Sequence, residues 1–232
     1  MFRSYKFSFE EVRPEMPLLM ECLQIPDEEN YAPVSSIVKK TFEELKDSEE
    51  ITGGYRIMDC LNVDVQGGIV ACSSGYLHTG RKISGYMKGA DQLALFLCTA
   101  GKTFTRLSHA YQQNGDFLEA FVVETIGSAT VENAMDKVQL YLEKEMMEQG
   151  KKITNRYSPG YCEWVLSGQR DLFACIGDHP TGITINESCL MQPIKSVSGI
   201  IGIGNEVRKR PYGCDICNST SCVYRNIRKK NQ

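Results

Sequence analysis

Residues 156–161, with the sequence Arg-Tyr-Ser-Pro-Gly-Tyr, combine side chains that suit the binding of a small carboxylate ligand. The planar guanidinium of Arg156 can hold a carboxylate through two parallel hydrogen bonds, which a lysine cannot do. The Pro159-Gly160 turn lacks one side chain, so backbone groups there can approach a ligand closely. Tyr161 adds a flat, amphipathic face. An ordinary turn beside a partly buried arginine is the alternative interpretation.

A second set of chemically active residues, Cys214, Cys217 and Cys222, lies near the C-terminus. Three thiolates at this spacing can surround one metal, and zinc or an iron–sulfur cluster usually has four ligands. Cys162, Cys189 or a small molecule would supply the fourth ligand. A free or redox-active pair of thiols in a tail is the alternative.

Other motifs do not support catalysis. Gly101-Lys102-Thr103 resembles the end of a phosphate-binding loop, but Phe96 occupies the position where that motif requires its first glycine. The three histidines are scattered along the chain, and no Ser-His-Asp or Cys-His set is indicated by spacing.

Composition narrows the class of protein. A chain of 232 residues is long enough to bury a core, and its net charge of −3 does not favour nucleic-acid binding. Residues 1–19 hold no apolar run typical of a signal peptide, and no stretch is apolar enough to span a membrane. Ten cysteines without a secretory signal indicate a reducing compartment, so we expect a cytoplasmic protein.

The hydrophobic pattern predicts the elements that must position these residues. Apolar residues at helical spacing predict helices over residues 10–23, 34–45, 103–113, 116–149 and 167–176, with a break at residues 127–128. Alternating runs between glycine-rich turns predict strands over residues 55–87, at the end of residues 90–99, and over residues 182–187 and 196–203.

Within residues 116–149, the second half has the clearest stripe, and Gly150 provides a C-terminal stop. The stripe consists of Val131, Ala134, Met135, Val138, Leu142 and Met146.

This mixture predicts an α+β fold with a twisted, mainly antiparallel sheet packed against helices. We expect an N-terminal helical region over residues 1–50, an α+β core over residues 51–207, and a basic, cysteine-containing tail over residues 208–232.

The Arg-x-x-x-Gly-Tyr motif at residues 156–161 resembles the S-adenosylmethionine-binding motif of the reactivation (activation) domain of cobalamin-dependent methionine synthase. Two flanking segments are similar to that family as well. Residues 184–199 contain Asn-Glu-Ser, Met-Gln-Pro and Ser-Val-Ser-Gly, and residues 126–132 open the long predicted helix. These ordered matches span residues 126–204, about a third of the chain.

The resemblance implies a free-standing reactivation subunit of a cobalamin-dependent methyltransferase, of the methionine synthase type. Such a subunit places the methyl group of S-adenosylmethionine for reductive remethylation of cob(II)alamin. It implies that Arg156 binds the ligand's carboxylate and that Glu132 faces its amine or sulfonium. It further implies that backbone at Ser158 and Gly160 meets the adenine and that Tyr161 lies near the corrin. A glutamate in the first turn of a helix is, however, favourable without any ligand.

The implied cobalamin resides on a partner, because this chain lacks the Asp-x-His-x-x-Gly motif that holds the cofactor's lower axial ligand. The implied partners are therefore a cobalamin-binding methyltransferase subunit and an electron donor such as flavodoxin or ferredoxin. Cys162 stands where the family motif has a second proline. Two alternatives stay open: a non-catalytic docking module that has lost the ligand, and an iron–sulfur activator of other corrinoid methyltransferases.

Overall fold

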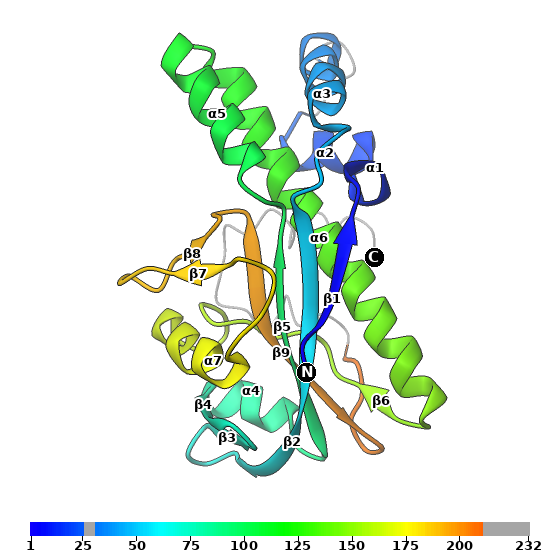
Figure 1. Ribbon diagram of the computed structural model, residues 1–232, viewed down its shortest axis with the longest axis vertical. Coiled ribbons are helices and arrows are strands. Elements are labelled where there is room, and N and C mark those ends of the chain that lie inside the picture. Colours follow the sequence, from blue (N-terminus) through cyan, green and yellow to red (C-terminus); the bar gives the residue numbers. More distant parts are fainter. Residues whose placement is uncertain (26–30, 211–232) are drawn as a thin grey trace.

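A seven-stranded sheet organises the chain, whose residues 1–25 and 31–210 are described by a computed structural model (Figure 1). Its strands are β1 (Arg3–Phe7), β2 (Ile51–Asp64), β3 (Ile69–Cys72), β4 (Gly75–His78), β5 (Gln92–Thr99), β6 (Lys152–Ile153) and β9 (Ser196–Gly204). They follow the order β4-β3-β2-β5-β9-β6, and β1 pairs with the beginning of β2. Every pairing is antiparallel. A separate hairpin joins β7 (Thr184–Ile185) to β8 (Met191–Gln192).

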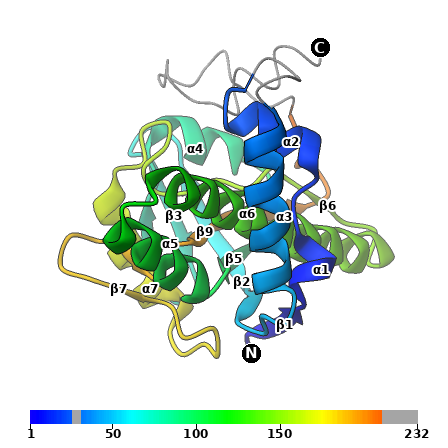
Figure 2. The same cartoon turned by 90° about the horizontal axis from the view of Figure 1, so that it is seen from above.

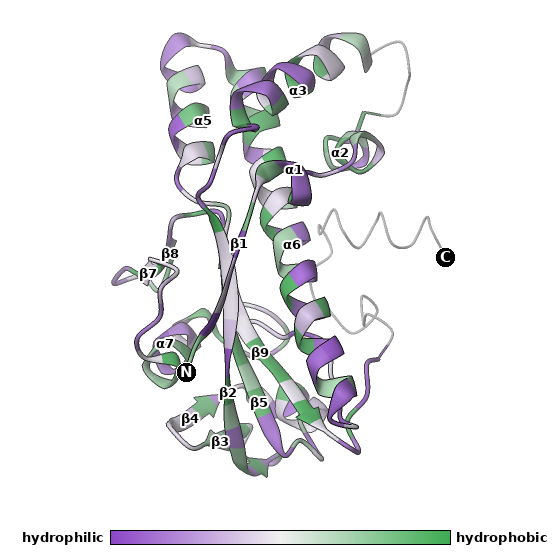
Figure 3. Cartoon of the chain, turned by 45° about the vertical axis from the view of Figure 1, so that its right-hand side comes forward, coloured by the Kyte–Doolittle hydropathy of each residue, from purple (hydrophilic) through white to green (hydrophobic). Residues whose placement is uncertain are grey.

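Helices cover both faces of this sheet. They are α1 (Phe9–Val12), α2 (Met16–Cys22), α3 (Tyr31–Leu45), α4 (Gly80–Tyr86), α5 (Thr103–Asn114), α6 (Phe117–Glu148) and α7 (Gln169–Ile176), with a 3-10 turn, η2, at Leu166–Gly168. The long helix α6 runs along one face, whereas α7 and the β7–β8 hairpin lie on the other (Figure 3). Helices α1, α2, α3 and α5 gather around the first half of α6 (Figure 2). The α+β fold with an antiparallel sheet is therefore confirmed.

The alternation of side chains along β5 explains why the sheet is covered twice. Residues 94, 96 and 98 pack into the core that faces α6, whereas residues 93, 95 and 97 pack into the core that faces α4 and α7. Successive side chains of a strand point to opposite faces, so a strand buried on both sides is apolar throughout. The sheet thus lies between two hydrophobic layers.

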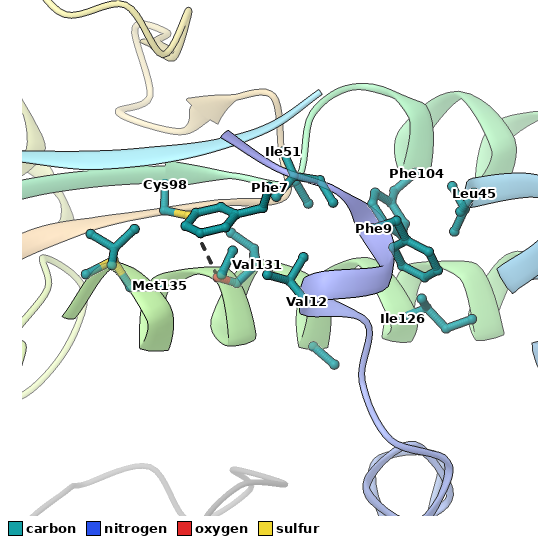
Figure 4. Close-up of a cluster of buried hydrophobic side chains, with 14 of the residues drawn as sticks. Phe7, Phe9, Val12, Leu45, Ile51, Cys98, Phe104, Ile126, Val131 and Met135 are labelled. Carbon is teal, nitrogen blue, oxygen red and sulfur yellow. Dashed lines mark hydrogen bonds between the residues drawn. The ribbon is translucent and has the colours of Figure 1, made fainter. Parts of the chain in front are cut away.

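The α6 side of the core is built largely from the predicted stripe. All six of its residues, from Val131 to Met146, are buried. Val131 and Met135 lie beside Cys98 of β5, and Phe7, Phe9 and Phe104 close the layer toward the N-terminal helices (Figure 4). The helix ends at Glu148, and Gly150 adopts a left-handed φ of 72°, as the stop signal predicted.

Two local predictions were wrong, and two elements were missed. The expected helix over residues 10–23 is divided into α1 and α2, since the residue before Pro14 adopts an extended conformation. Helix α6 continues through residues 127–128 without a break. Gly127 serves packing instead: a Cβ there would lie 2.9 Å from the ring of Phe104, so the glycine lets α5 pack closely on α6. Strand β1 and helix α4 were not predicted. Both are short elements that depend on neighbours distant in sequence for their hydrogen bonds or burial.

Within residues 1–25 and 31–210, none of the helices combines the length and the apolar run that crossing a membrane requires.

Candidate functional site

Residues 154–157 form the edge of the sheet next to β9 and place Arg156 there. The Tyr157 N–H donates to the Ile200 carbonyl at 3.0 Å, and the Ile200 N–H donates to the Tyr157 carbonyl at 2.8 Å. A Cβ atom on Gly199 would lie 2.0 Å from the Tyr157 carbonyl oxygen. Only a glycine therefore lets the arginine segment approach β9 this closely.

The guanidinium of Arg156 is held by two carboxylates of α6. Nη2 donates to Glu132 Oε2 at 2.6 Å, and Nη1 donates to Asp136 Oδ1 at 2.5 Å. The Arg156 side chain is 13% exposed, whereas Glu132 and Asp136 are 37% and 65% exposed. One cation and two carboxylates leave a net charge of −1, and the acidic side of the cluster faces solvent.

Helix α6 places both acidic residues because they are one turn apart. Side chains four residues apart share one face of a helix. The neighbouring face, with Val131, packs on β5, where the Cys98 thiol lies 4.0 Å from the Val131 carbonyl oxygen (Figure 4). Burial, with the nearby Glu132 carboxylate, raises the pKa of Cys98 to about 12. Cys98 is therefore a neutral packing residue beside the charged cluster.

After Arg156 the chain passes half-buried Ser158 and turns at Gly160. Gly160 has a φ of 94°, and its N–H donates to the Trp164 carbonyl at 2.7 Å. The Trp164 side chain is buried at 1% exposure and anchors the loop against α7 and the sheet. Tyr161 is 61% exposed. The turn thus presents Tyr161 on the surface, on a rigid base.

A pocket of about 250 Å³ adjoins this turn. One wall is Leu166, which lies 3.8 Å from the position that a Cβ on Gly160 would take. Other lining residues come from the β7–β8 hairpin, including Leu190, and from Ile194, which follows it. Leu166, Leu190 and Ile194 are 40%, 54% and 61% exposed, so the rim of the pocket is apolar and open.

The downstream segment that resembled the family braces these parts. Ser198 Oγ donates to buried Gln169 Oε1 of α7 at 2.7 Å. Lys195 Nζ is paired with Glu124 Oε2 of α6 at 2.5 Å and donates to Ser128 Oγ at 3.0 Å. Residues 195–198 therefore connect β9 to the helices on both faces of the sheet.

The predicted metal ligands Cys214, Cys217 and Cys222 lie outside the described residues. Of the candidates for a fourth ligand, Cys162 and Cys189, the latter accepts a hydrogen bond from Arg170 Nε at 3.1 Å on its sulfur. Among residues 1–25 and 31–210, no group of three or more His, Cys, Asp or Glu side chains is arranged to hold a metal ion.

The structure thus brings Arg156 and Glu132 together. Gly160 and Tyr161 lie in the turn that follows Arg156 along the chain. It adds Asp136, which the sequence analysis missed. The helical spacing of Asp136 from Glu132 was the available signal. It also adds Gly199 and Trp164, whose roles depend on contacts between distant segments and leave no local pattern.

Comparison with known proteins gives a consistent result. Residues 82–219, more than half of the chain, match the family model described as vitamin B12 dependent methionine synthase, activation domain. A crystal structure of the MetH reactivation domain bound to AdoHcy has a similar fold, with a TM-score of 0.66 and 14% sequence identity over 90% of this chain and 80% of that one. No curated protein matches the chain.

Proposed function

The chain belongs to the vitamin B12 dependent methionine synthase activation domain family, and from that premise we propose that it binds S-adenosylmethionine at Arg156 and places the ligand's methyl group toward cobalamin on a partner. The observation that carries this proposal is the nearly buried guanidinium, held between two carboxylates and followed by a turn in which Gly160 and Tyr161 are exposed. Its contribution would be positioning, so an acid–base pair is not required.

The charge of the cluster fits this ligand. S-adenosylmethionine carries a carboxylate, an ammonium and a sulfonium, hence a net charge of +1, whereas the Arg156 cluster has −1. We propose that the ligand's carboxylate takes the place of Asp136 on the guanidinium. Asp136 is 65% exposed and can turn toward the ligand's ammonium, while Glu132 stays paired and faces the sulfonium. Opposite charges at contact distance in a half-buried site favour binding.

The turn after Arg156 would receive the rest of the ligand. Backbone groups at Ser158 and Gly160 would meet the adenine, since the glycine leaves room for close approach. Tyr161 would lie against the corrin of the partner. Bound cobalamin supplies the metal chemistry of methyl transfer, and an electron donor such as flavodoxin or ferredoxin supplies the electron.

The partner surface would be the apolar rim formed by Leu166, Leu190 and Ile194, next to Tyr161. All four are exposed large hydrophobic residues, and three of them line one pocket. An exposed apolar patch with a polar surround is typical of a protein interface. No disulfide joins two cysteines within residues 1–25 and 31–210, which supports a reducing compartment such as the cytoplasm.

A docking module without ligand binding is the second candidate. Two observations favour it. Glu132 and Asp136 already pair with Arg156. Cys162, with a φ of 53°, stands where the family has a second proline. An iron–sulfur activator would depend on cysteines beyond the described residues.

Calorimetric titration with S-adenosylmethionine, with and without the partner's cobalamin domain, tests the proposal. Binding of S-adenosylmethionine in preference to S-adenosylhomocysteine supports it. Association with the cobalamin domain, without heat from either nucleoside ligand, would establish the docking module instead.

A further inference from the structure

Two buried thiols from distant parts of the chain, Cys72 and Cys175, meet on the face of the sheet opposite α6. Cys72 ends β3, Cys175 lies in the last turn of α7, and each is 4% exposed. Gly75 is the cross-strand partner of Cys72 at the β3–β4 turn, and a Cβ on Gly75 would lie 3.0 Å from Cys175 Sγ. The Cys175 sulfur therefore rests against the turn that holds Cys72.

Polar groups surround the sulfur of Cys72. The nearby Cys175 thiol has the largest effect on its pKa, and the hydroxyl of Ser74, at 3.4 Å, and the backbone N–H groups of Ser74 and Gly75 act in the same direction. Together they outweigh burial and lower the pKa of Cys72. The nearby Cys72 thiol, together with burial, raises the pKa of Cys175. Cys72 is thus the more acidic thiol of the two, and a thiol with a lowered pKa suits redox chemistry.

We propose that Cys72 and Cys175 form a redox-active pair that closes to a reversible disulfide on reaction with hydrogen peroxide. The Cys72 thiolate attacks one peroxide oxygen, the O–O bond breaks, and a sulfenic acid forms. The released hydroxide takes the proton of Cys175 and becomes water. The Cys175 thiolate then attacks the Cys72 sulfur, the S–O bond breaks, and the second hydroxide takes a proton from solvent. The two sulfurs lose two electrons, the peroxide gains two, and a low-molecular-weight thiol such as glutathione reverses the bond by exchange.

Cys60 is the competing partner, because it lies opposite Cys72 in the β2–β3 register. That register shifts immediately after Cys60. Burial raises the pKa of Cys60 to about 11, so it is neutral at physiological pH. The sulfur of Cys175, in contrast, lies over the β3–β4 turn, 3.0 Å from the position of a Cβ on Gly75, the cross-strand partner of Cys72. This position therefore selects Cys175.

A crosslink at this place would fix α7 to the β3–β4 hairpin. Helix α7 carries Gln169, which accepts a hydrogen bond from Ser198 of β9. It also carries Arg170, which donates a hydrogen bond to Cys189 at the pocket. The disulfide would thus constrain the helix that braces both β9 and the pocket hairpin, whatever ligand the protein binds.

Peptide mapping of the full chain can test the pairing directly. The reduced protein is treated with one equivalent of hydrogen peroxide, remaining thiols are alkylated, and the chain is cleaved before each aspartate. Cys60, Cys72 and Cys175 then fall on separate peptides, residues 59–63, 64–90 and 171–177. We expect a disulfide between the second and third peptides that a thiol reductant removes. A link between the first and second peptides, or the absence of any link to residues 171–177, would overturn the proposal.

The wild-type protein suffices for this mapping, so its outcome does not depend on the folding of a variant. As a second measurement, closing the loop should raise the melting temperature of the oxidised protein by about 4–16 °C. Cys60→Ser should retain this rise, and Cys175→Ser should lose it. An equal rise in Cys175→Ser would show that another disulfide forms and would refute the pairing.

Discussion

Replacing Arg156 with alanine should weaken the binding of S-adenosylmethionine by about ten- to a hundredfold. The guanidinium is 13% exposed, so a hydrogen bond from it to the ligand's carboxylate is largely shielded from water. Loss of a charge-assisted hydrogen bond costs about 1.5–3 kcal/mol, which corresponds to this range in affinity. Arg156→Lys should recover only part of the loss, because an ammonium cannot form the bidentate pair.

The same substitution should have a small effect on the free protein. The carboxylates left behind, on Glu132 and Asp136, are 37% and 65% exposed and can be hydrated. Because the acidic partners of Arg156 are hydrated, each ion pair should contribute only about 0–1 kcal/mol, so the melting temperature should fall by only a few degrees. A large fall would mean that Arg156 acts mainly in folding.

The assay is calorimetric titration at fixed ionic strength, with thermal unfolding of each variant in the same buffer. Arg106→Ala is a matched control, since Arg106 lies on α5 rather than beside α6, is 71% exposed and pairs with Glu50. It should leave the affinity for S-adenosylmethionine unchanged. Equal affinity of wild type and Arg156→Ala, or an equal loss in Arg106→Ala, would refute the assignment of the carboxylate site.

Three further predictions concern the same structural features. Asp136→Asn removes the negative charge that the ligand's ammonium would meet, worth about 1 kcal/mol, so calorimetry should show the affinities for S-adenosylmethionine and S-adenosylhomocysteine, which both carry this ammonium, falling about fivefold each; unchanged affinities would contradict the charge argument. Gly199→Ala places a Cβ 2.0 Å from the Tyr157 carbonyl oxygen and should destabilise the protein by about 1–3 kcal/mol in urea unfolding, and a neutral result would show that this edge can move. Although burial opposes ionisation of Glu50, hydrogen bonds from the first N–H groups of α5 lower its pKa. Its contribution to stability is therefore complete above pH ~4.5 and lost as the pH falls through the lowered pKa, so Glu50→Gln should flatten the pH dependence of the urea midpoint between pH ~5 and ~3.

The sequence by itself determined features that depend on local periodicity and turn chemistry. The stripe from Val131 to Met146 is buried as predicted, because its 3.6-residue period fixes one face of a helix whatever packs against it. Gly150 ends that helix, and Gly160 adopts a positive φ, because only glycine takes these conformations without strain. The antiparallel α+β class followed from strands and helices that do not alternate regularly.

Only the tertiary structure decided which distant residues meet. The ion pair of Arg156 with Asp136 forms because the segment that carries Arg156 lies beside β9, where α6 packs on the sheet, and residues 156–161 alone do not predict that contact. Gly127 suggested a helix break by propensity, yet it permits the approach of Phe104 across two packed helices. Strand β1 exists only through its pairing with β2.

The two thiols show the same division. In the sequence, Cys72 and Cys175 are isolated cysteines that predict no contact. The closely spaced Cys214, Cys217 and Cys222 were instead predicted as metal ligands. Strand register brings Cys72 to Gly75, and the packing of α7 on β4 brings Cys175 to the same turn. Spacing along a chain reveals contacts within one element, while contacts between elements depend on register and packing, which are properties of the whole core.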